Sequence, residues 1–357
     1  MNYRTVFGRH SLLAAAPMAA VLLVTGCDAT APSDEATDTT AVTLTNCGKE
    51  VNFNAPVERV VATSNSANVG TILKVGGLDR LAAVSLNKEN DAVLDSMFGT
   101  GIAEVPHLQS SSSGITMETI LGTNADLVVG SYSGLFKGAT GITPESLGKH
   151  GIGAYIISDS CRQGEGDDAA MGTMDPWDAL RADVTNYGTL FGTEDKAKAA
   201  GEELDKRLDR LKSATKPATP LRVLIYDSGE EDLYTSGGNG APNGIIDAAG
   251  GVNVFGDIDN TWFRASWETV AKADPDVIVI MDYKKTPGEV DQKIAAIKAR
   301  AGLRDTKAVQ QNRFVVLPLA MFTSGYPNIY GAEQLRAKME GFGVVPDSGT
   351  DFTQPPK

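Results

Sequence analysis

A cysteine near the N-terminus lies where lipid can be attached covalently. Residues 1–10 carry two arginines and a histidine, and residues 11–24 are apolar or small and uncharged. The stretch ends Leu23-Val24-Thr25-Gly26-Cys27, with an aliphatic residue three positions before the cysteine and a small one directly before it. This pattern predicts an export signal that is cleaved before Cys27, whose amine and thiol then accept lipid. The alternative is an ordinary signal peptide with a cysteine there by chance.

The two remaining cysteines, Cys47 and Cys161, are candidates for a disulfide. The chain has three cysteines, and Cys27 is expected to carry lipid. A cysteine pair in an exported protein is usually oxidised, because reducing thiols are confined to the cytosol. We therefore predict a Cys47–Cys161 disulfide that fixes the start of the folded body to the first lobe. Two buried free thiols are the alternative.

Two glutamates, Glu118 and Glu268, lie at matching positions of an internal repeat. In the first copy, Met117-Glu118-Thr119-Ile120 precedes Asn124-Ala125-Asp126-Leu127-Val128-Val129. In the second copy, Trp267-Glu268-Thr269-Val270 precedes Asp274-Pro275-Asp276-Val277-Ile278-Val279 at the same offset. Each copy predicts a short helix, a turn that carries an aspartate, and an aliphatic strand covered on both faces of its sheet.

Other segments of the two copies match as well. Strands are expected at Arg59-Val60-Val61 and at Arg222-Val223-Leu224-Ile225, each followed by a polar loop, a short helix and a glycine pair. The pairs Gly76-Gly77 and Gly250-Gly251 indicate helices that end in the left-handed conformation. Strands that alternate with helices predict parallel sheets with right-handed crossovers. The expected fold class is α/β, with two doubly wound Rossmann-like lobes. One further strand is expected in each lobe, at residues 152–157 and 313–317.

Two helices are expected between the lobes. Asp175-Pro176-Trp177 marks a helix start, because aspartate caps a helix and proline fits its first turn, and Gly192 ends this helix. The second helix runs from about Glu194 to Lys212, with one narrow apolar stripe and a charged opposite face. At 1.5 Å per residue it is ~30 Å long. We expect this helix to be the single stiff connector between the lobes, with a ligand cleft between them.

Composition and these elements divide the chain into six expected segments. Residues 28–45 are rich in Thr, Ala, Asp and Ser, which predicts a flexible tether. The formal charge of −13 argues against nucleic acid or an anionic membrane surface as a partner. The segments are a signal peptide (1–26), the tether (27–46), an N-terminal lobe (47–192), the bridging helix (193–214), a C-terminal lobe (215–346) and a tail (347–357).

Several short segments, in a fixed order along the chain, carry a resemblance to a known family. They are Val57-Glu58-Arg59-Val60-Val61, Gly76-Gly77-Leu78-Asp79-Arg80-Leu81, Ile115-Thr116-Met117-Glu118, Ala125-Asp126-Leu127-Val128, Ser266-Trp267-Glu268 and Asp274-Pro275-Asp276-Val277-Ile278. From about Cys47 to Phe342 the chain resembles the bacterial substrate-binding proteins whose two lobes are joined by one long helix. Those proteins serve importers of iron siderophores, haem and vitamin B12. Asn46-Cys47-Gly48 and Ser160-Cys161-Arg162 resemble a branch common in high-GC Gram-positive bacteria.

The resemblance implies a function, a location and partners. It implies the extracytoplasmic, lipid-anchored substrate-binding component of an ABC importer, which captures a ferric siderophore or a related iron or corrin chelate. The implied partners are that chelate, a permease dimer with its ATPase, and the membrane through the anchor. A monomer is expected, with no covalent cofactor other than lipid.

The resemblance also implies a role for the repeated glutamates. In that family a surface glutamate on each lobe inserts into arginine pockets of the two permease subunits, and the matching positions are Glu118 and Glu268. Two equivalent carboxylates also suit a transporter built of two equivalent halves, because charge pairs at such a contact set its orientation. The alternative is that both are ordinary first-turn glutamates favoured by the helix dipole.

The expected sheets also supply candidates for ligand binding. In open α/β sheets, ligands bind beyond the carboxyl ends of the strands, so the loops there hold the contact residues. Trp262 and Arg264 could stack on a chelate and pair with its negative oxygens. The alternative is a core tryptophan beside a solvated arginine. The candidates are Asn65, Tyr132, Tyr226, Tyr234, Trp262, Arg264, Tyr283 and Tyr326.

Haem, bare metal ions and catalysis give the alternative functions. A haem- or cobalamin-binding lipoprotein of the same family is one, and His107 could then be an axial ligand to haem. His107 and His150 are the two histidines after the signal segment, too few for a zinc or manganese site, so no direct metal site is expected. The chain lacks G-x-S-x-G, Walker A, G-x-G-x-x-G and H-E-x-x-H motifs. An extracellular enzyme on the same lobes is therefore a distant alternative, and a protein that feeds a sensor is another.

Overall fold

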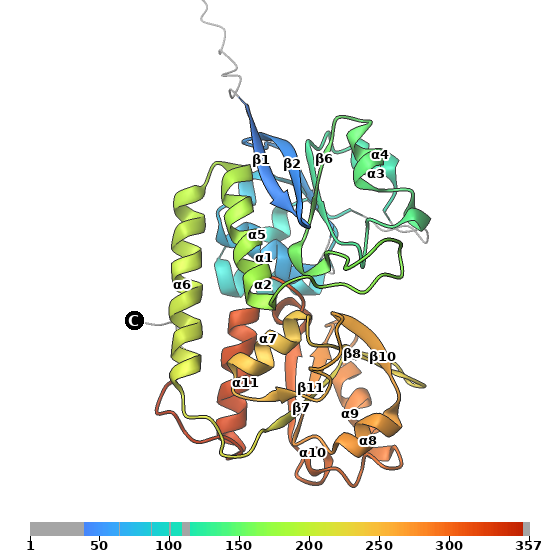
Figure 1. Ribbon diagram of the computed structural model, residues 1–357, viewed down its shortest axis with the longest axis vertical. Helices are drawn as coiled ribbons and strands as arrows, with labels where there is room; N and C mark the ends of the chain where they lie inside the picture. Colours follow the sequence, from blue (N-terminus) through green and yellow to red (C-terminus); the bar gives the residue numbers. More distant parts are fainter. Residues whose placement is uncertain (1–38, 64, 87, 100, 109–114, 353–357) are drawn as a thin grey trace, which may run out of the picture. The chain divides into compact units, whose positions relative to one another are not determined.

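The computed structural model describes residues 39–63, 65–86, 88–99, 101–108 and 115–352, which form two α/β lobes (Figure 1). The expected signal peptide and the expected lipid site at Cys27 lie outside the described residues. The elements of the N-terminal lobe are β1 (Thr40–Asn46), β2 (Lys49–Ala55), β3 (Val60–Ala62), α1 (Ser66–Lys74), β4 (Leu81–Val84), α2 (Asp91–Phe98), α3 (Met117–Leu121), β5 (Leu127–Gly130), α4 (Pro144–Gly148) and β6 (Gly153–Ile156).

Two helices, α5 (Pro176–Phe191) and α6 (Glu194–Ser213), connect this lobe to the second. The elements of the C-terminal lobe are β7 (Arg222–Tyr226), β8 (Leu233–Ser236), α7 (Ala241–Ala248), β9 (Val252–Asn253), β10 (Trp262–Ala265), α8 (Trp267–Ala273), β11 (Val277–Asp282), α9 (Glu289–Ala299), α10 (Lys307–Gln310), β12 (Phe314–Pro318) and α11 (Asn328–Gly341). Among the described residues, no helix is both long and apolar enough to cross a membrane.

Each lobe contains a four-stranded parallel sheet. The strand order is β4-β3-β5-β6 in the N-terminal lobe and β12-β11-β7-β9 in the C-terminal lobe. Residues of β5 and β11 are buried throughout, which agrees with continuous aliphatic strands covered on both faces. The predicted fold class is therefore confirmed. The antiparallel pair β8–β10 is a separate two-stranded sheet in the C-terminal lobe.

The internal repeat corresponds to the same local structure in both lobes. Thr116 caps α3 and Ser266 caps α8, and each side chain accepts a hydrogen bond from the backbone N–H three residues later, at 3.2 Å. The aspartate that precedes the strand also has the same role twice. Asp126 accepts the backbone N–H of Arg59 at 3.0 Å, and Asp276 accepts that of Arg222 at 2.9 Å. Each aspartate thus fastens the central strand to the start of its neighbour.

The glycine pairs end equivalent helices, as the sequence predicts. Gly76 and Gly250 have φ angles of +82° and +90°, in the left-handed region that a side chain disfavours. After α1, the N–H of Gly77 bonds to the carbonyl of Ile72 at 2.8 Å. After α7, the N–H of Gly251 bonds to the carbonyl of Ile246 at 2.9 Å. This spacing of five residues is that of a Schellman motif in both lobes.

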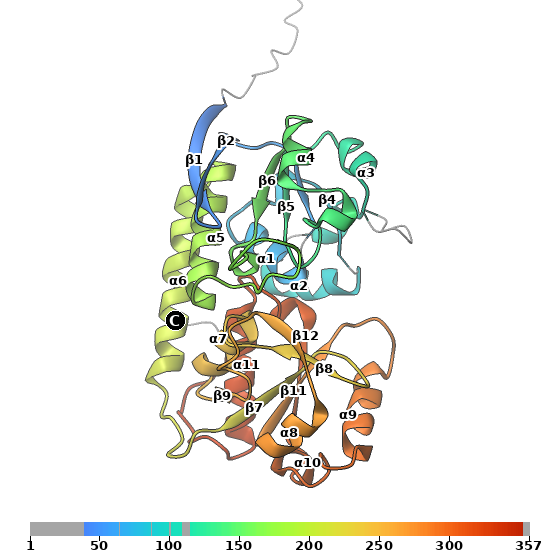
Figure 2. The same cartoon turned by 45° about the vertical axis from the view of Figure 1, so that its right-hand side comes forward.

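The bridging helix α6 packs along both lobes (Figures 1 and 2). Its Glu203 pairs with Lys74 of α1 at 2.6 Å, and its buried Arg207 pairs with Glu333 of α11 at 2.5 Å. One continuous cluster of buried apolar residues extends from Val60 in the first sheet to Val277 in the second. The lobes therefore share a core along their helical side, which restrains their relative movement.

The structure corrects the expected tether at its end. Residues 27–46 were expected to be flexible, but Thr40–Asn46 form strand β1, which pairs with β2. Cys47 and Gly48 make the turn with φ angles of +49° and +71°, the left-handed geometry that a two-residue hairpin loop requires. Val42 and Leu44 lie on one face of β1 and pack against the core, and this alternation outweighs the polar composition.

The expected tail also begins too early. Residues 347–357 were expected to lie outside the lobe, but Phe352 is buried and belongs to the main apolar cluster. The guanidinium carbon of Arg210 lies 5.3 Å from the centre of its ring. Arg336 donates to the carbonyl of Pro346 at 2.8 Å, which holds the segment that leads to Phe352. The chain therefore returns to α6 after α11 ends.

Candidate ligand-binding cleft

The loops after the strands of both sheets meet at a cavity between the lobes. Such a position, beyond the carboxyl ends of parallel strands, is where ligands bind in open α/β folds. The cavity has a volume of about 270 Å³. Its lining residues from the N-terminal lobe are Asn65, Ser131, Ser133, Gly134, Ile157, Asp159 and Ser160. Those from the C-terminal lobe are Asp227, Tyr234, Thr261, Trp262, Tyr283, Leu319, Thr323 and Ser324.

Aromatic side chains form the wall on the side of the C-terminal lobe. Trp262 on β10 stacks on Tyr234 of β8, with ring centres 5.6 Å apart and planes at 23°. The antiparallel pairing of these strands brings the two rings together, because Trp262 lies opposite Ser236 and Tyr234 opposite Arg264. The wall thus offers a flat apolar surface to a ligand.

A carboxyl group follows β7 on the same side of the cavity. Asp227 is 4% exposed, and the hydroxyl of Tyr283 donates to it at 2.8 Å. Burial raises the pKa of the Asp227 carboxyl, and hydrogen bonds from Ser228 and Tyr283 lower it. The pKa of the Tyr283 hydroxyl lies well above its usual value, first because of burial and then because of the charge on Asp227. The phenol therefore stays protonated and holds the carboxylate in place.

A second carboxyl faces the cavity from the N-terminal lobe. Asp159 lies in a short 3-10 helix after β6, Ser158–Ser160, and is 8% exposed. Its Oδ1 atom has no hydrogen-bond partner. Burial, and then the charge of Asp183, raise the pKa of the Asp159 carboxyl to about 7, and the Ser324 hydroxyl of the other lobe lowers it.

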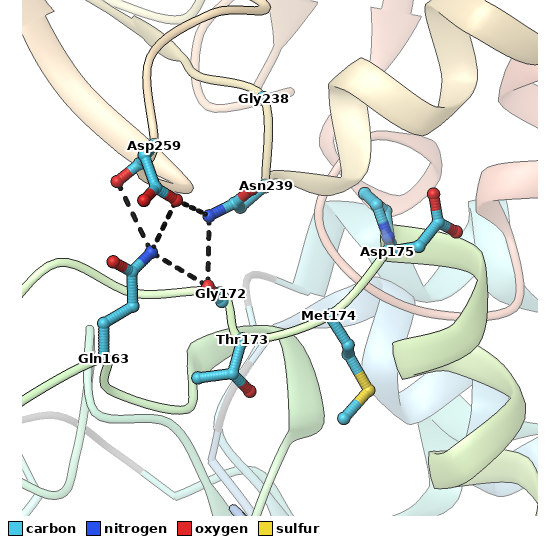
Figure 3. Close-up of a pocket in the computed structure, with 9 residues that line it drawn as sticks. Gln163, Gly172, Thr173, Met174, Asp175, Gly238, Asn239 and Asp259 are labelled. Carbon is cyan, nitrogen blue, oxygen red and sulfur yellow. Dashed lines mark hydrogen bonds between the residues drawn. The ribbon is translucent and has the colours of Figure 1, made fainter.

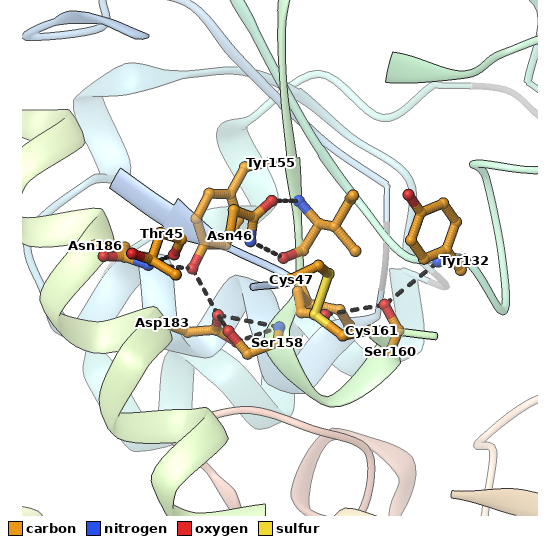
Figure 4. Close-up of a disulfide and its surroundings, with 12 residues drawn as sticks. Thr45, Asn46, Cys47, Tyr132, Tyr155, Ser158, Ser160, Cys161, Asp183 and Asn186 are labelled. Atoms are coloured by element: carbon orange, nitrogen blue, oxygen red, sulfur yellow. Dashed lines mark hydrogen bonds between the residues drawn. A yellow bond between two sulfur atoms is a disulfide. The ribbon is translucent and has the colours of Figure 1, made fainter. Parts of the chain in front are cut away.

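Asp183 on α5 supports the turn that carries Asp159 (Figure 4). Its Oδ1 accepts hydrogen bonds from the Tyr155 hydroxyl at 2.8 Å, the Ser158 hydroxyl at 2.7 Å and the Ser158 N–H at 3.1 Å. Burial raises the pKa of the Asp183 carboxyl to about 6, against these hydrogen bonds. Asp183 is thus fully engaged in supporting the turn.

The predicted disulfide is present and lies at the end of the same turn (Figure 4). Cys161 follows the turn directly, and Cys47 lies in the loop of the β1–β2 hairpin. Asn46 adds two hydrogen bonds to Ile156 of β6, one to its carbonyl at 2.7 Å and one from its N–H at 2.9 Å. The hairpin and the disulfide therefore also hold the turn, in addition to the hydrogen bonds of Asp183.

Polar contacts join the lobes next to the cleft (Figure 3). In the N-terminal lobe, the amide of Gln163 donates to Asp259 Oδ1 at 2.9 Å, and the N–H of Met171 donates to Asn260 Oδ1 at 3.1 Å. From the C-terminal lobe, Asn239 donates to the carbonyl of Gly172 at 3.0 Å. We call these residues, Gln163, Met171, Gly172, Asn239, Asp259 and Asn260, the inter-lobe bridge.

Gly172 allows the closest approach within the inter-lobe bridge. Its φ angle is +90°, and a Cβ atom at this position would lie 2.4 Å from the Cβ of Asn239. A larger residue would separate the two segments. The bridge residue Gln163 follows Ser160 closely in the N-terminal lobe, and Asn260 directly precedes Thr261 in the C-terminal lobe. Ser160 and Thr261 both line the cleft. The bridge therefore holds the two sides of the cleft at a fixed separation.

The structure places the eight candidate ligand residues in three groups. Asn65, Tyr234, Trp262 and Tyr283 line the cleft. Tyr132 and Arg264 do not line it but lie next to residues that do. The guanidinium carbon of Arg162 lies 4.0 Å from the Tyr132 ring centre, and that of Arg264 lies 5.7 Å from the Tyr234 ring centre.

The remaining two candidates, Tyr226 and Tyr326, are buried away from the cleft. Tyr226 is 5% exposed and packs edge-on against Trp267 at 5.3 Å between ring centres. Tyr326 is fully buried, and its hydroxyl donates to the carbonyl of Ala200 on α6 at 3.1 Å. Both tyrosines are therefore structural, and their prediction as cleft residues is corrected.

His107 does not offer a free nitrogen for haem. Its Nδ1 lies 2.9 Å from the carbonyl of Val105, and its Nε2 lies 3.1 Å from Asp91 Oδ2. Both nitrogens face acceptor oxygens, and the side chain is 7% exposed. Among the residues that the structure describes, no three His, Cys, Asp or Glu side chains gather in a way that could hold a metal ion.

Glu118 and Glu268 are exposed on the first turns of α3 and α8. Each helix belongs to one lobe, and both lie on the side away from α6 (Figures 1 and 2). Glu268 forms an exposed ion pair with Lys272 at 2.9 Å. The matching caps and anchoring aspartates place the two glutamates at the same position of equivalent helices, but the residue four positions later is Lys272 in one and Gly122 in the other.

Two parallel-sheet lobes, a cleft at their carboxyl ends and a helical connector define the class of two-lobed solute-binding proteins. The sequence profile of the periplasmic binding protein family matches residues 61–320, and the chain belongs to this family. A vitamin B12-binding protein of Yersinia pestis is 24% identical over 227 residues, which cover 62% of this chain and 69% of that protein.

Solved structures share the fold. A periplasmic binding protein from Veillonella parvula superposes with a TM-score of 0.69 at 23% identity, covering 85% of this chain and 98% of that one. A protein of an Fe3+-hydroxamate transport system from Saccharomonospora viridis superposes with a TM-score of 0.67 at 24% identity, covering 84% of this chain and 98% of that one. A periplasmic heme-binding protein from Roseiflexus superposes with a TM-score of 0.57 at 22% identity, covering 83% of this chain and 99% of that one.

Proposed function

We propose that this protein captures a ferric siderophore outside the cell membrane and delivers it to the permease of an ABC importer. The observation that carries the proposal is the cleft between the carboxyl ends of the two sheets, to which both lobes contribute polar side chains and the C-terminal lobe an aromatic wall. Such a site encloses a small molecule and has none of the catalytic motifs considered above.

The size of the cleft argues against a corrin, the largest of the candidate ligands. Its volume of about 270 Å³ is at the lower limit of small-molecule sites, which are roughly 300–1,000 Å³. A corrin would need the lobes to separate further, against the inter-lobe bridge and the shared core. Haem would also need an axial ligand, and the hydrogen bonds of His107 oppose that role. A cobalamin-binding function has the support of the Yersinia relative.

Two further parts of the proposal concern attachment and docking. Cleavage before Cys27 would leave the protein anchored by lipid on the extracytoplasmic face, with the lobes free to meet solutes. Glu118 and Glu268 would then contact one permease subunit each, since they lie at the same position of equivalent helices. Docking of the loaded protein would be followed by release of the chelate, driven by ATP hydrolysis on the far side.

A panel of ligands tests the proposed function. Residues 28–357 would be melted alone and with a ferric trihydroxamate, a ferric tris-catecholate, ferric citrate, cyanocobalamin and hemin. A ligand at 100 times its Kd stabilises the native state by about 2.7 kcal/mol, which raises the melting temperature by several degrees. We expect a ferric chelate to give such a shift. A shift with cyanocobalamin or hemin alone would replace the proposal with that ligand.

Two variants relate any shift to the cleft. Trp262→Ala removes part of the aromatic wall and should reduce affinity at least ~10-fold. Tyr326→Phe removes a hydrogen bond on the helical side and should cost about 1 kcal/mol of stability without changing affinity. Equal loss of affinity in both variants would place the ligand outside the cleft.

A further inference from the structure

The charges around the cleft are negative. Asp159 from one lobe and Asp227 from the other line it, and no Lys, Arg or His is among the described residues that do. Two lysines near the cleft lie over the face of an aromatic ring. The ammonium groups of Lys285 and Lys293 lie 4.6 Å and 4.8 Å from the Tyr283 ring centre. A ligand within the cleft therefore meets carboxyl groups before it meets a basic side chain.

The two carboxyl groups differ in how they are satisfied. Asp227 accepts the hydroxyl of Tyr283, and the charges of Lys293 and Lys285 act on it favourably. Asp159 has less support, because the Ser324 hydroxyl bonds to its carboxyl group but its buried Oδ1 accepts no hydrogen bond. Among the charged groups around Asp159, Asp183 carries the same sign and makes ionisation harder.

A buried carboxylate with one oxygen unsatisfied is costly unless another molecule supplies a hydrogen-bond donor. Burying a polar atom without a hydrogen bond costs about 1–3 kcal/mol, and more if the group is charged. The fold does not use Asp159 for support, because Asp183 already holds the turn through Tyr155 and Ser158. The turn itself is fixed by two independent contacts, the hydrogen bonds to Asp183 of α5 and the disulfide. Asp159 is therefore held in place where it lines the cavity, and its Oδ1 is buried directly behind the cavity surface.

We infer that the cleft selects a ferric chelate that carries a free ammonium group, and that Asp159 receives this group as an ion-paired hydrogen-bond acceptor. The inference rests on the proposed function and narrows its substrate class. The aromatic wall of Trp262 and Tyr234 would cover the apolar part of the chelate, and Asp227 would add a second negative charge across the cleft. Anionic chelates, such as ferric tris-catecholates, would be repelled by both carboxyl groups.

A matched pair of ligands tests the inference. One is a linear ferric trihydroxamate that ends in a free primary amine, and the other is the same chelate with that amine acetylated. Each is titrated into residues 28–357 at pH 8, with tryptophan fluorescence as the readout because Trp262 lines the cleft. We expect the free amine to bind about tenfold more tightly or better, the usual value of a hydrogen bond to a charged group.

Two substitutions assign the preference to one residue. Asp159→Asn keeps the size of the side chain and should reduce the ratio of the two Kd values to about 1–2, chiefly by weakening the binding of the amine. Asp282→Asn is the matched control, because Asp282 is also buried but pairs with Lys284 at 2.7 Å and does not line the cleft. This control should keep the preference of the wild-type protein.

The outcomes separate the inference from the function on which it rests. Equal affinity of the wild-type protein for both chelates, or an undiminished preference in Asp159→Asn, would overturn the inference and leave the proposed function intact. Binding of neither chelate, together with no shift from any ferric chelate in the melting panel, would overturn both. Unfolding without ligand gives an independent check. Asp159→Asn should stabilise the protein at pH 8, and a loss of stability would show that the carboxylate already has a partner.

Discussion

Asp159 and Asp183 are buried carboxyl groups of one lobe, and only Asp183 is fully supplied with hydrogen-bond donors. Asp183 Oδ1 accepts from Tyr155 and from two groups of Ser158, whereas Asp159 Oδ1 accepts from none. The pKa values follow this difference, at about 6 for Asp183 and about 7 for Asp159. Both lie above the ordinary aspartate value of 3.8 because burial disfavours the charged form.

The raised pKa of Asp159 predicts that the ligand-free protein loses stability as the pH rises. Between about pH 4 and pH 7 the folded protein keeps the Asp159 proton, and the unfolded chain, with an ordinary pKa, has released it. Raising the pH through this window therefore lowers the free energy of unfolding, on the order of 2–4 kcal/mol for a shift of this size. Asp159→Asn should make the decline less steep, leaving the part that comes from the raised pKa of Asp183, measured by urea unfolding at pH 4.5, 6 and 8.

Asp282→Asn serves as the control for this profile. Asp282 is buried to the same degree but is ion-paired with Lys284. Its replacement should leave the decline between pH 4.5 and pH 8 in place. A wild-type stability that stays constant or rises over this range would contradict the prediction.

Replacing both repeated glutamates should strongly reduce transport and leave ligand binding intact. Glu118→Arg with Glu268→Arg reverses the charge on α3 and α8, which should lower uptake at least ~10-fold if the two carboxylates orient the docked complex. The Kd for the chelate should stay within about twofold, because neither glutamate lines the cleft. Uptake of radiolabelled iron chelate into proteoliposomes that contain the permease measures the first effect.

Glu145→Arg is the matched control for docking. Glu145 is an exposed first-turn glutamate on α4, behind the Thr143 cap, and so shares the local setting without the repeat position. It should support normal uptake. Normal uptake in the double variant would mean that both glutamates serve only their own helices.

The inter-lobe bridge should control how fast the ligand leaves. Gln163→Ala removes the hydrogen bonds to Asp259 and to the carbonyl of Gly172. At about 1 kcal/mol for each bond, dissociation should be roughly 3- to 10-fold faster, as measured by stopped-flow fluorescence. Gln310→Ala is the control, because Gln310 donates only within its own lobe, to the carbonyl of Arg304. The same dissociation rate in both variants would exclude a role for the bridge.

Loss of the disulfide should affect stability and binding together. The bond closes a sequence separation of 114 residues, so its removal should lower the free energy of unfolding by about 2–5 kcal/mol. Affinity should fall as well, because Cys161 follows the turn that carries Asp159. Urea unfolding and ligand titration with and without reductant measure both effects. The variant Cys47→Ser with Cys161→Ser should be insensitive to reductant, and a wild-type protein that is equally insensitive would contradict the prediction.

The framework of the fold could be predicted from the sequence because it depends on local patterns of residue types. The repeated strands, the glycine pairs after α1 and α7, and the ends of α5 and α6 all follow from spacing and capping residues. The buried Arg207 could not be predicted this way. It lies within the apolar stripe of α6 and is satisfied by Glu333, which is 126 positions away in the chain.

Four of the eight candidate ligand residues line the cleft, and their contact with a ligand remains a prediction. The alternation of side chains along β7 explains why Tyr226 was wrongly expected in the cleft. Tyr226 shares the face of Leu224 in the second apolar cluster, so the next residue, Asp227, is the one directed to the cleft. Asp159 lies in the loop after β6, where ligand-binding residues are expected. It was not singled out because an aspartate between two serines is common in loops and does not indicate a binding role. Tyr326 was misplaced because contact with α6 depends on how the lobes pack.

The shared core along α5, α6 and α11 has a consequence for the importer itself. If a rigid back side fixes the distance between Glu118 and Glu268, an empty protein offers the permease nearly the same footprint as a full one. Unloaded copies would then occupy docking sites without delivering cargo. Uptake would pass through a maximum as the number of anchored copies rises above the supply of chelate, and further expression would slow the import of iron.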